Sequence, residues 1–131
     1  MKRLTVEWVR KAEADFQAAR KVARGKPRLN DQVGFLCQQT VEKYLKALLH
    51  ELGQPVPQTH DLRQLLNLLL PHDSTLGSLR RGVEPLTKYG VAYRYPGKHA
   101  TTRQAQSALR QAQRVRQEIR RRLGIRARRS P

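Results

Sequence analysis

An arginine and a histidine flank a break in the chain, in the last third of the sequence. Arg94 and His99 are five positions apart, with Pro96 and Gly97 between them. On an unbroken helix this spacing would turn the two side chains roughly 140° apart. Pro96 disfavours helical geometry before it and Gly97 permits turn dihedrals, so the chain can fold back and let the pair converge. An arginine can hold a phosphate in two-pronged fashion, and a histidine can move protons near neutral pH.

Two interpretations of this segment stay open. Residues 94–97 are either a helix stop followed by a solvated His99, or part of a site that handles phosphate. Three tyrosines lie in the same stretch, at Tyr89, Tyr93 and Tyr95. They could stack nucleic-acid bases, but clustered tyrosines at a helix end serve equally well as packing and interface residues.

Apolar residues at helical spacing predict five amphipathic segments that must position this break. We expect helices at about 5–24, 31–52, 60–70, 76–93 and 101–123. The second segment has the strongest apolar stripe and is predicted to be the central core helix. The fourth contains Gly77, Gly82 and Pro85, so it is an imperfect helix that can split near Pro85. No segment alternates like a strand, and the predicted fold class is an all-α, up-and-down bundle of four to five helices.

Helix ends are predicted from short polar residues and glycines. The expected N-caps are Thr5, either Asn30 or Asp31, and Thr59, and the expected closing glycines are Gly53 and Gly124. We therefore assign residues 1–124 to one helical domain and residues 125–131 to a basic disordered tail.

Polar residues of the second helix form another candidate region. Gln38, Gln39, Glu42 and Lys43 fall opposite its apolar stripe, together with Lys46 and Phe35. We expect them to form the polar side of that helix, and with Tyr89 they are candidates for an interface or a cleft.

Two other polar positions have competing interpretations. Asp15 borders the first stripe, either as a salt-bridge partner or as a cleft residue. His60 precedes Asp61 at a helix start, where the acid is favoured by the helix dipole. For His60, packing against the loop is favoured over a catalytic or metal role.

The charge balance points to a polyanionic partner. The chain has 27 Lys and Arg against 10 Asp and Glu, a net charge of +17. Nucleic acid, an acidic protein and an anionic membrane surface all fit this charge, and so does a compositional bias from the genome or a hot habitat. Arg110 and Arg114 lie one turn apart on the last helix, near Arg103, and form either a solvated face or a ridge that tracks phosphates.

The sequence argues against several classes of site. Cys37 is the only cysteine, so no intramolecular disulfide and no zinc site of several cysteines can form, and we expect it to be a small buried hydrophobe. There is no glycine-rich phosphate loop, and no metal or cofactor is predicted. No run of about 18 apolar residues is present, so we expect a soluble, cytoplasmic protein without membrane contact.

Four motifs in order resemble the HEPN domain family, the helical family of prokaryotic toxins and nucleotidyltransferase partners. They are Trp8-x3-Ala12-x2-Asp15-Phe16, Phe35-x2-Gln38-Gln39-x2-Glu42-Lys43-x2-Lys46-Ala47-Leu48, Thr59-His60-Asp61-Leu62 and Arg94-Tyr95-Pro96. The resemblance spans about residues 4–124. It implies a bundle that dimerises.

The resemblance also implies a site. Arg94-x4-His99 is similar to the family's R-x(4–6)-H ribonuclease motif, which in active members converges from two subunits. The implied reaction is metal-independent RNA cleavage by the RNA's own 2′-hydroxyl, with His99 as general base or acid and Arg94 stabilising the phosphorane. Nucleotide or RNA would be held by Tyr93, Tyr95, Lys98, Arg103, Arg110 and Arg114.

Two departures favour a different subgroup. Tyr95 and Pro96 follow the arginine where ribonuclease members carry a polar residue, and Thr101 stands where some toxins carry a tyrosine. Members with Arg-Tyr-Pro often accompany a minimal nucleotidyltransferase. The first hypothesis is therefore a homodimeric module that binds nucleotide or RNA and pairs with a nucleotidyltransferase in a toxin–antitoxin-like system. The second is an RNA endonuclease toxin, and a basic scaffold without a site is the third.

Overall fold

The computed structural model describes residues 1–126, and every element in them is helical. The α-helices are α1 (Arg3–Arg24), α2 (Asn30–Glu51), α3 (Leu62–Leu69), α4 (Arg80–Val83) and α5 (Thr102–Arg122). Three short 3-10 helices complete the fold: η1 (Ser74–Leu79), η2 (Glu84–Gly90) and η3 (Ala92–Arg94). The prediction of an all-α bundle is confirmed.

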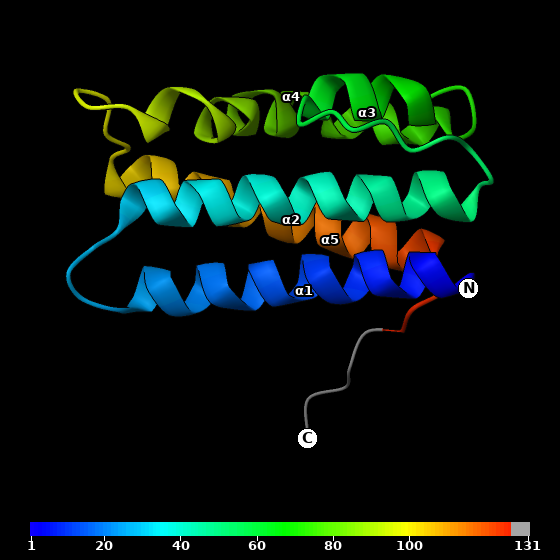
Figure 1. The fold of residues 1–131 in the computed structure, drawn as a ribbon, viewed down its shortest axis with the longest axis horizontal. Coiled ribbons are helices and arrows are strands. Elements are labelled where there is room, and N and C mark those ends of the chain that lie inside the picture. Colours follow the sequence, from blue (N-terminus) through cyan, green and yellow to red (C-terminus); the bar gives the residue numbers. More distant parts are fainter. Residues whose placement is uncertain (127–131) are drawn as a thin grey trace.

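The predicted core helix is at the centre of the molecule. Figure 1 shows α2 between α1 on one side and the layer of α3 and α4 on the other, with α5 packed behind. Tyr44, Leu45 and Leu49 of α2 are fully buried, because helices cover it on several sides. At its start Asn30 Nδ2 donates to Thr102 Oγ1 (3.2 Å), and further along Arg120 Nη1 lies 3.3 Å from the Tyr44 hydroxyl, so α2 and α5 run parallel.

The fourth predicted helix is a chain of short turns. Residues 74–94 form η1, α4, η2 and η3 in succession, and Pro85 lies in the first turn of η2, as predicted for the break. Gly77, Gly82 and Pro85 lower helical stability here, so tertiary contacts decide the backbone.

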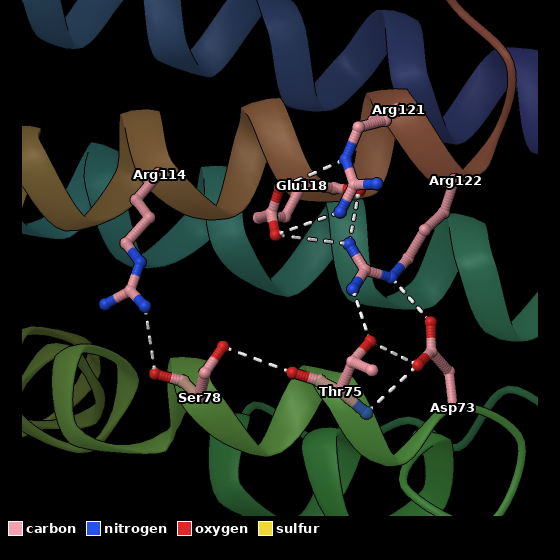
Figure 2. Close-up of polar contacts among 7 residues, drawn as sticks. All are labelled: Asp73, Thr75, Ser78, Arg114, Glu118, Arg121 and Arg122. Carbon is pink, nitrogen blue, oxygen red and sulfur yellow. Dashed lines mark hydrogen bonds and ion pairs between the residues drawn. The ribbon is translucent and has the colours of Figure 1, made fainter.

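Polar contacts dock the first of these turns on α5 (Figure 2). Asp73 accepts from the backbone N–H of Thr75 (3.0 Å) and from Arg122 Nε (2.6 Å), and Arg122 Nη2 donates to Thr75 Oγ1 (2.7 Å). Hydrogen bonds from Thr75 and Arg122 hold the pKa of Asp73 below its usual value. One turn further along η1, the Ser78 carbonyl oxygen accepts from Arg114 Nη2 (3.2 Å).

The predicted N-caps are wrong in each case. Thr5 is buried inside α1, whose N-cap is Lys2. Helix α2 follows Leu29 without a side-chain cap, because Asn30 and Asp31 bind residues before and within α5 instead.

The start of α3 is capped by Asp61, which accepts from the N–H groups of Arg63 and Gln64. Thr59 instead accepts from the Asp61 N–H at 3.1 Å. The closing glycines are confirmed, since Gly53 and Gly124 adopt φ values of 73° and 74°. The sequence analysis missed the capping box that Thr101 and Gln104 form at the start of α5.

Other expectations about single residues are resolved by the packing. Asp15 is a salt-bridge partner, with its Oδ2 atom 2.5 Å from Lys43 Nζ. Cys37 is fully buried, and burial raises the pKa of its thiol to about 12, so it is inert core. Ile125 packs partly against the core, and the remainder of the predicted tail, residues 127–131, lies outside the described residues. Among residues 1–126, none of the helices combines the length and the apolar character that crossing a bilayer needs.

Candidate nucleic-acid interface

Arg94 and His99 lie against neighbouring turns of one helix face. The Arg94 guanidinium is 5.8 Å from the centre of the Phe35 ring, and His99 Nδ1 is 3.5 Å from Asp31 Oδ2. Phe35 and Asp31 are four residues apart on α2, which places them on the same side about 6 Å apart along the axis. Gly97 has a φ of 85°. The turn there lets Arg94, before it, and His99, after it, both lie against this face of α2.

Asp31 organises the His99 side of this region. Its Oδ1 atom accepts from the Ala100 backbone N–H at 2.6 Å, while Oδ2 faces Nδ1 of His99. Because Nδ1 faces the carboxylate, Nε2 is the ring nitrogen that can contact a ligand. The His99 side chain is 79% exposed, so a ligand can reach it. The hollow beside it measures about 290 Å³ and is lined by residues 28–32, around the start of α2, and by His99 and Ala100. We predicted Asp31 only as a helix cap, because nothing in the sequence shows a contact across 69 positions.

The three tyrosines have different surroundings. Tyr89 and Tyr93 stack with ring centres 4.8 Å apart. Tyr89 is buried over Gly34, and burial raises the pKa of its hydroxyl to about 12. Tyr93 is half-buried, whereas Tyr95 is 66% exposed. The interface and packing interpretation therefore fits Tyr89, and only Tyr95 offers an open ring face next to Arg94.

The predicted basic residues do not all gather at this site. Lys98 lies in the same loop and Arg103 in the first turn of α5, and both are exposed. Arg110 and Arg114 line a different hollow, with Phe16 and Arg20 of α1. Arg114 is also bound to η1, so one of its donors serves the fold.

The expectation of a polar, accessible side on α2 is wrong for Gln38, Glu42 and Lys46, which are buried. The loop before α3 and the end of η2 cover this side. Glu42 accepts from Gln38 Nε2 (3.2 Å) and Lys46 Nζ (3.1 Å), and its Oε1 atom lies 2.9 Å from Nδ1 of His60. Gln39 and Lys43 are half-buried, donating to Gln38 and to Asp15.

The buried cluster of Gln38, Glu42 and Lys46 packs against the segment that leads to the candidate site. Gln38 Nε2 also donates to the His60 carbonyl oxygen (3.1 Å), and a Cβ at Gly90 would lie 3.5 Å from the Gln38 amide. It therefore joins the loop before α3 to the end of η2, four residues before Arg94. His60 serves this packing. No group of three or more His, Cys, Asp and Glu side chains suited to a metal ion occurs within residues 1–126.

Comparison with known proteins adds one finding. The model of the HEPN domain matches residues 5–122, nearly the whole chain. Searches of curated proteins and of solved structures gave no match. Because the match covers all five helices and the Arg94 segment between them, the chain belongs to the HEPN domain family.

Proposed function

We propose that this protein is a homodimeric HEPN module that binds RNA or a nucleotide through the Arg94 segment and pairs with a minimal nucleotidyltransferase in a toxin–antitoxin-like system. The observation that carries the proposal is the placement of Arg94 and His99 on one face of α2 by Phe35 and Asp31. A guanidinium fixed over an aromatic ring keeps its N–H groups available for a phosphate.

The surroundings of the pair suit an anionic ligand with a ring system. Lys98 adds a second exposed cation to Arg94 in the same loop. Tyr95 offers an exposed ring on which a base can stack. Asp31 is the acidic group of this hollow, and the Ala100 N–H and His99 engage it. The site therefore carries excess positive charge on exposed side chains.

The dimer belongs to the proposal for a physical reason. Val91 and Tyr95 are 62% and 66% exposed and flank Arg94 in sequence, so they leave apolar surface uncovered beside the site. A two-fold interface there would bury this surface and place two copies of Arg94 and His99 next to each other. The nucleotidyltransferase partner is proposed from the Arg94-Tyr95-Pro96 motif that the chain shares with that subgroup.

A second candidate function, metal-independent RNA cleavage, is favoured by the Asp31–His99 contact. A carboxylate facing Nδ1 orients an imidazole so that Nε2 can take a proton from a 2′-hydroxyl. The 2′-oxygen would then attack phosphorus, and the bond to the 5′-oxygen would break. A second histidine across the dimer could protonate that leaving oxygen, and Arg94 would stabilise the charged phosphorane. The products are a 2′,3′-cyclic phosphate and a 5′-hydroxyl.

One experiment separates the two functions. Purified protein is mixed with end-labelled RNA in EDTA, beside Arg94→Ala, His99→Ala and the control Arg81→Ala, an exposed arginine on α4. For the binding module we expect intact RNA and about fivefold weaker binding by Arg94→Ala alone. Cleavage that leaves cyclic phosphate ends and disappears in both site variants would assign the nuclease. Equal binding by all four proteins would contradict a site at Arg94.

A further inference from the structure

A groove runs between α1 and α5, away from the Arg94 segment. The two helices are antiparallel neighbours, with Phe16 and Glu13 both facing Arg116. Small buried residues, among them Ala12 and Ala112, lie along the packed sides of the two helices. Two open hollows of about 440 and 1160 Å³ follow the line between them and share Gln113 and Gln117. The groove therefore extends from the Arg110 turn of α5 to the end of that helix.

Arginine dominates the lining of this groove. Seven arginines and a single carboxylate line the two hollows; the arginines are Arg20, Arg110, Arg114, Arg116, Arg120, Arg121 and Arg126. The carboxylate, Glu13, already accepts from Arg116 Nε (2.7 Å) and Nη2 (2.8 Å) and from the Tyr44 hydroxyl (2.6 Å). Arg120 lies 3.8 Å from the same carboxylate, and Arg121 pairs with Glu118 at 3.3 Å. The other four arginines of the lining form no ion pair among residues 1–126.

The outer end of the groove holds arginines that the fold does not use in ion pairs. Arg20 and Arg110 are exposed and form no salt bridge among residues 1–126, and Arg20 rests 5.9 Å from the centre of the Phe16 ring. Arg110 and Arg114 are one helical turn, about 6 Å, apart on the same ridge. Arg116 packs on the same Phe16 ring at 5.1 Å. Contact with the Phe16 ring limits guanidinium motion, so less entropy is lost when a phosphate binds.

We propose that the α1–α5 groove binds the backbone of single-stranded RNA, as a second surface separate from the Arg94 site. Arginines on both walls contact phosphates, and Gln17, Gln113 and Gln117 supply amide donors and acceptors that can meet ribose hydroxyls or base edges. This inference takes its ligand class from the proposed function but rests on different residues.

Two features favour RNA over an acidic peptide, to which arginines bind equally well. A bound peptide usually anchors a large apolar side chain in a pocket. The apolar residues of this lining are mostly covered, since Phe16 is 3% exposed and Leu109 and Ile125 are half-buried, and glutamine amides lie at the centre of the groove. Since no aromatic ring of the groove is open for stacking, the arginines and amides must supply the contacts. Binding should then be independent of sequence and strongly dependent on salt.

The groove lies at a distance from the Arg94 site along the bundle. The Arg94 loop precedes α5 and meets the first turn of α2, at the end of the bundle where the chain changes from yellow to gold in Figure 1. The arginines of the groove begin eight residues into α5 and continue to its other end. A long strand can therefore contact both surfaces, whereas a mononucleotide can contact only one.

The test uses fluorescence anisotropy with a labelled 20-nucleotide oligouridylate and a labelled poly-glutamate peptide of equal charge. The groove variant is Arg20→Gln with Arg110→Gln. The matched control, Arg63→Gln with Arg81→Gln, removes the same charge from α3 and α4, on the opposite side of α2 from α1 (Figure 1). A third protein carries Arg94→Gln. Each is measured from 50 to 300 mM salt, and circular dichroism checks that it is folded.

We expect the groove variant to bind the oligouridylate about tenfold more weakly than the control, with a salt slope lower by about 1.4, the effect of two lost phosphate contacts. Equal affinity of groove variant and control would overturn the groove. If Arg94→Gln alone binds more weakly, the Arg94 site stands without the groove. Loss in the groove variant alone would support the groove while contradicting the Arg94 site. Tighter binding of poly-glutamate than of RNA would overturn the assignment of the ligand, as would no RNA binding by the unmodified protein.

Discussion

At the scale of single residues, Glu13 links three helices. Its carboxylate accepts from Arg116 of α5, from Tyr44 of α2 and from Gln17 of its own helix. Burial acts to raise its pKa, but these hydrogen bonds outweigh burial and lower the pKa to about 2. The sequence did not identify this residue, because a glutamate beside an apolar stripe is ordinarily solvated and its partners lie up to 103 positions away.

Glu13→Gln should destabilise the protein in a pH-dependent way. A folded pKa of about 2 against 4.5 means that the carboxylate stabilises the fold above pH 4.5 and loses this effect as the pH falls towards 2. Because the side chain is partly exposed, we expect a loss of about 2 kcal/mol at pH 7 and roughly half of it at pH 3. Urea denaturation at both pH values measures the difference. Glu7→Gln, an exposed change on the same helix, should have no such effect, and a constant difference for Glu13→Gln would refute the linkage.

Sequence reasoning selected the candidate residues of the site more readily than the residues that contact them. Arg94 and His99 stand out because a Pro-Gly break brings two chemically capable side chains near each other. Asp31 and Phe35 hold them in place, but both were interpreted from their own helix alone. A contact made by tertiary folding leaves no periodic signal, so pattern analysis assigns such residues to caps or faces.

At the scale of elements, periodicity predicted α1, α2 and α5 well and the segment 74–94 poorly. Long apolar stripes determine the three long helices, which begin and end within two residues of expectation. In residues 74–94, glycines and a proline weaken helical propensity, and docking against α2 and α5 sets the short turns. The same docking buries Gln38 and Glu42, which sequence places on an open polar face, because the 3.6-residue period cannot show that a second layer covers that face.

Gly34→Ala should displace the element that carries Arg94. A Cβ at Gly34 would lie 2.0 Å from Cδ1 of Tyr89, a buried ring that cannot move without shifting η2. Alanine would favour α2 by about 1 kcal/mol through helix propensity, but overpacking costs about 1–3 kcal/mol, so we expect net destabilisation. Amide hydrogen exchange should also speed up in residues 84–94.

Gly25→Ala is the matched control, since its Cβ would meet nothing closer than 3.7 Å and φ is −85°. If both variants unfold at the same urea concentration, Tyr89 can adapt and the packing argument fails. Because η2 leads to Arg94, a shift of η2 in Gly34→Ala should also weaken the binding of RNA or nucleotide at Arg94.

At the scale of the whole molecule, the arginine-lined groove and the most exposed apolar residues lie on different elements. The net charge of +17 is concentrated in part on the α1–α5 side, where seven arginines line the groove. The most exposed large apolar residues among residues 1–126 are Val91 and Tyr95, close to Arg94. Burial of apolar area favours contact between two copies through the Val91 and Tyr95 surface, and the groove then stays open to a polyanion.

Tyr95→Glu tests this arrangement directly. A carboxylate in place of a ring that is 66% exposed costs the monomer little, but at a two-fold interface it would be desolvated close to its own copy. We expect the dimer dissociation constant in sedimentation equilibrium to rise about tenfold or more. At dilutions where both the variant and the unmodified protein are monomeric, their melting temperatures should be equal. Leu68→Glu, a 41% exposed position on α3, should leave the dimer intact. If Leu68→Glu alone dissociates the dimer, the copies meet through α3 and the Arg94 sites are not brought together. If the unmodified protein is monomeric at every concentration, the proposed site must function within one chain.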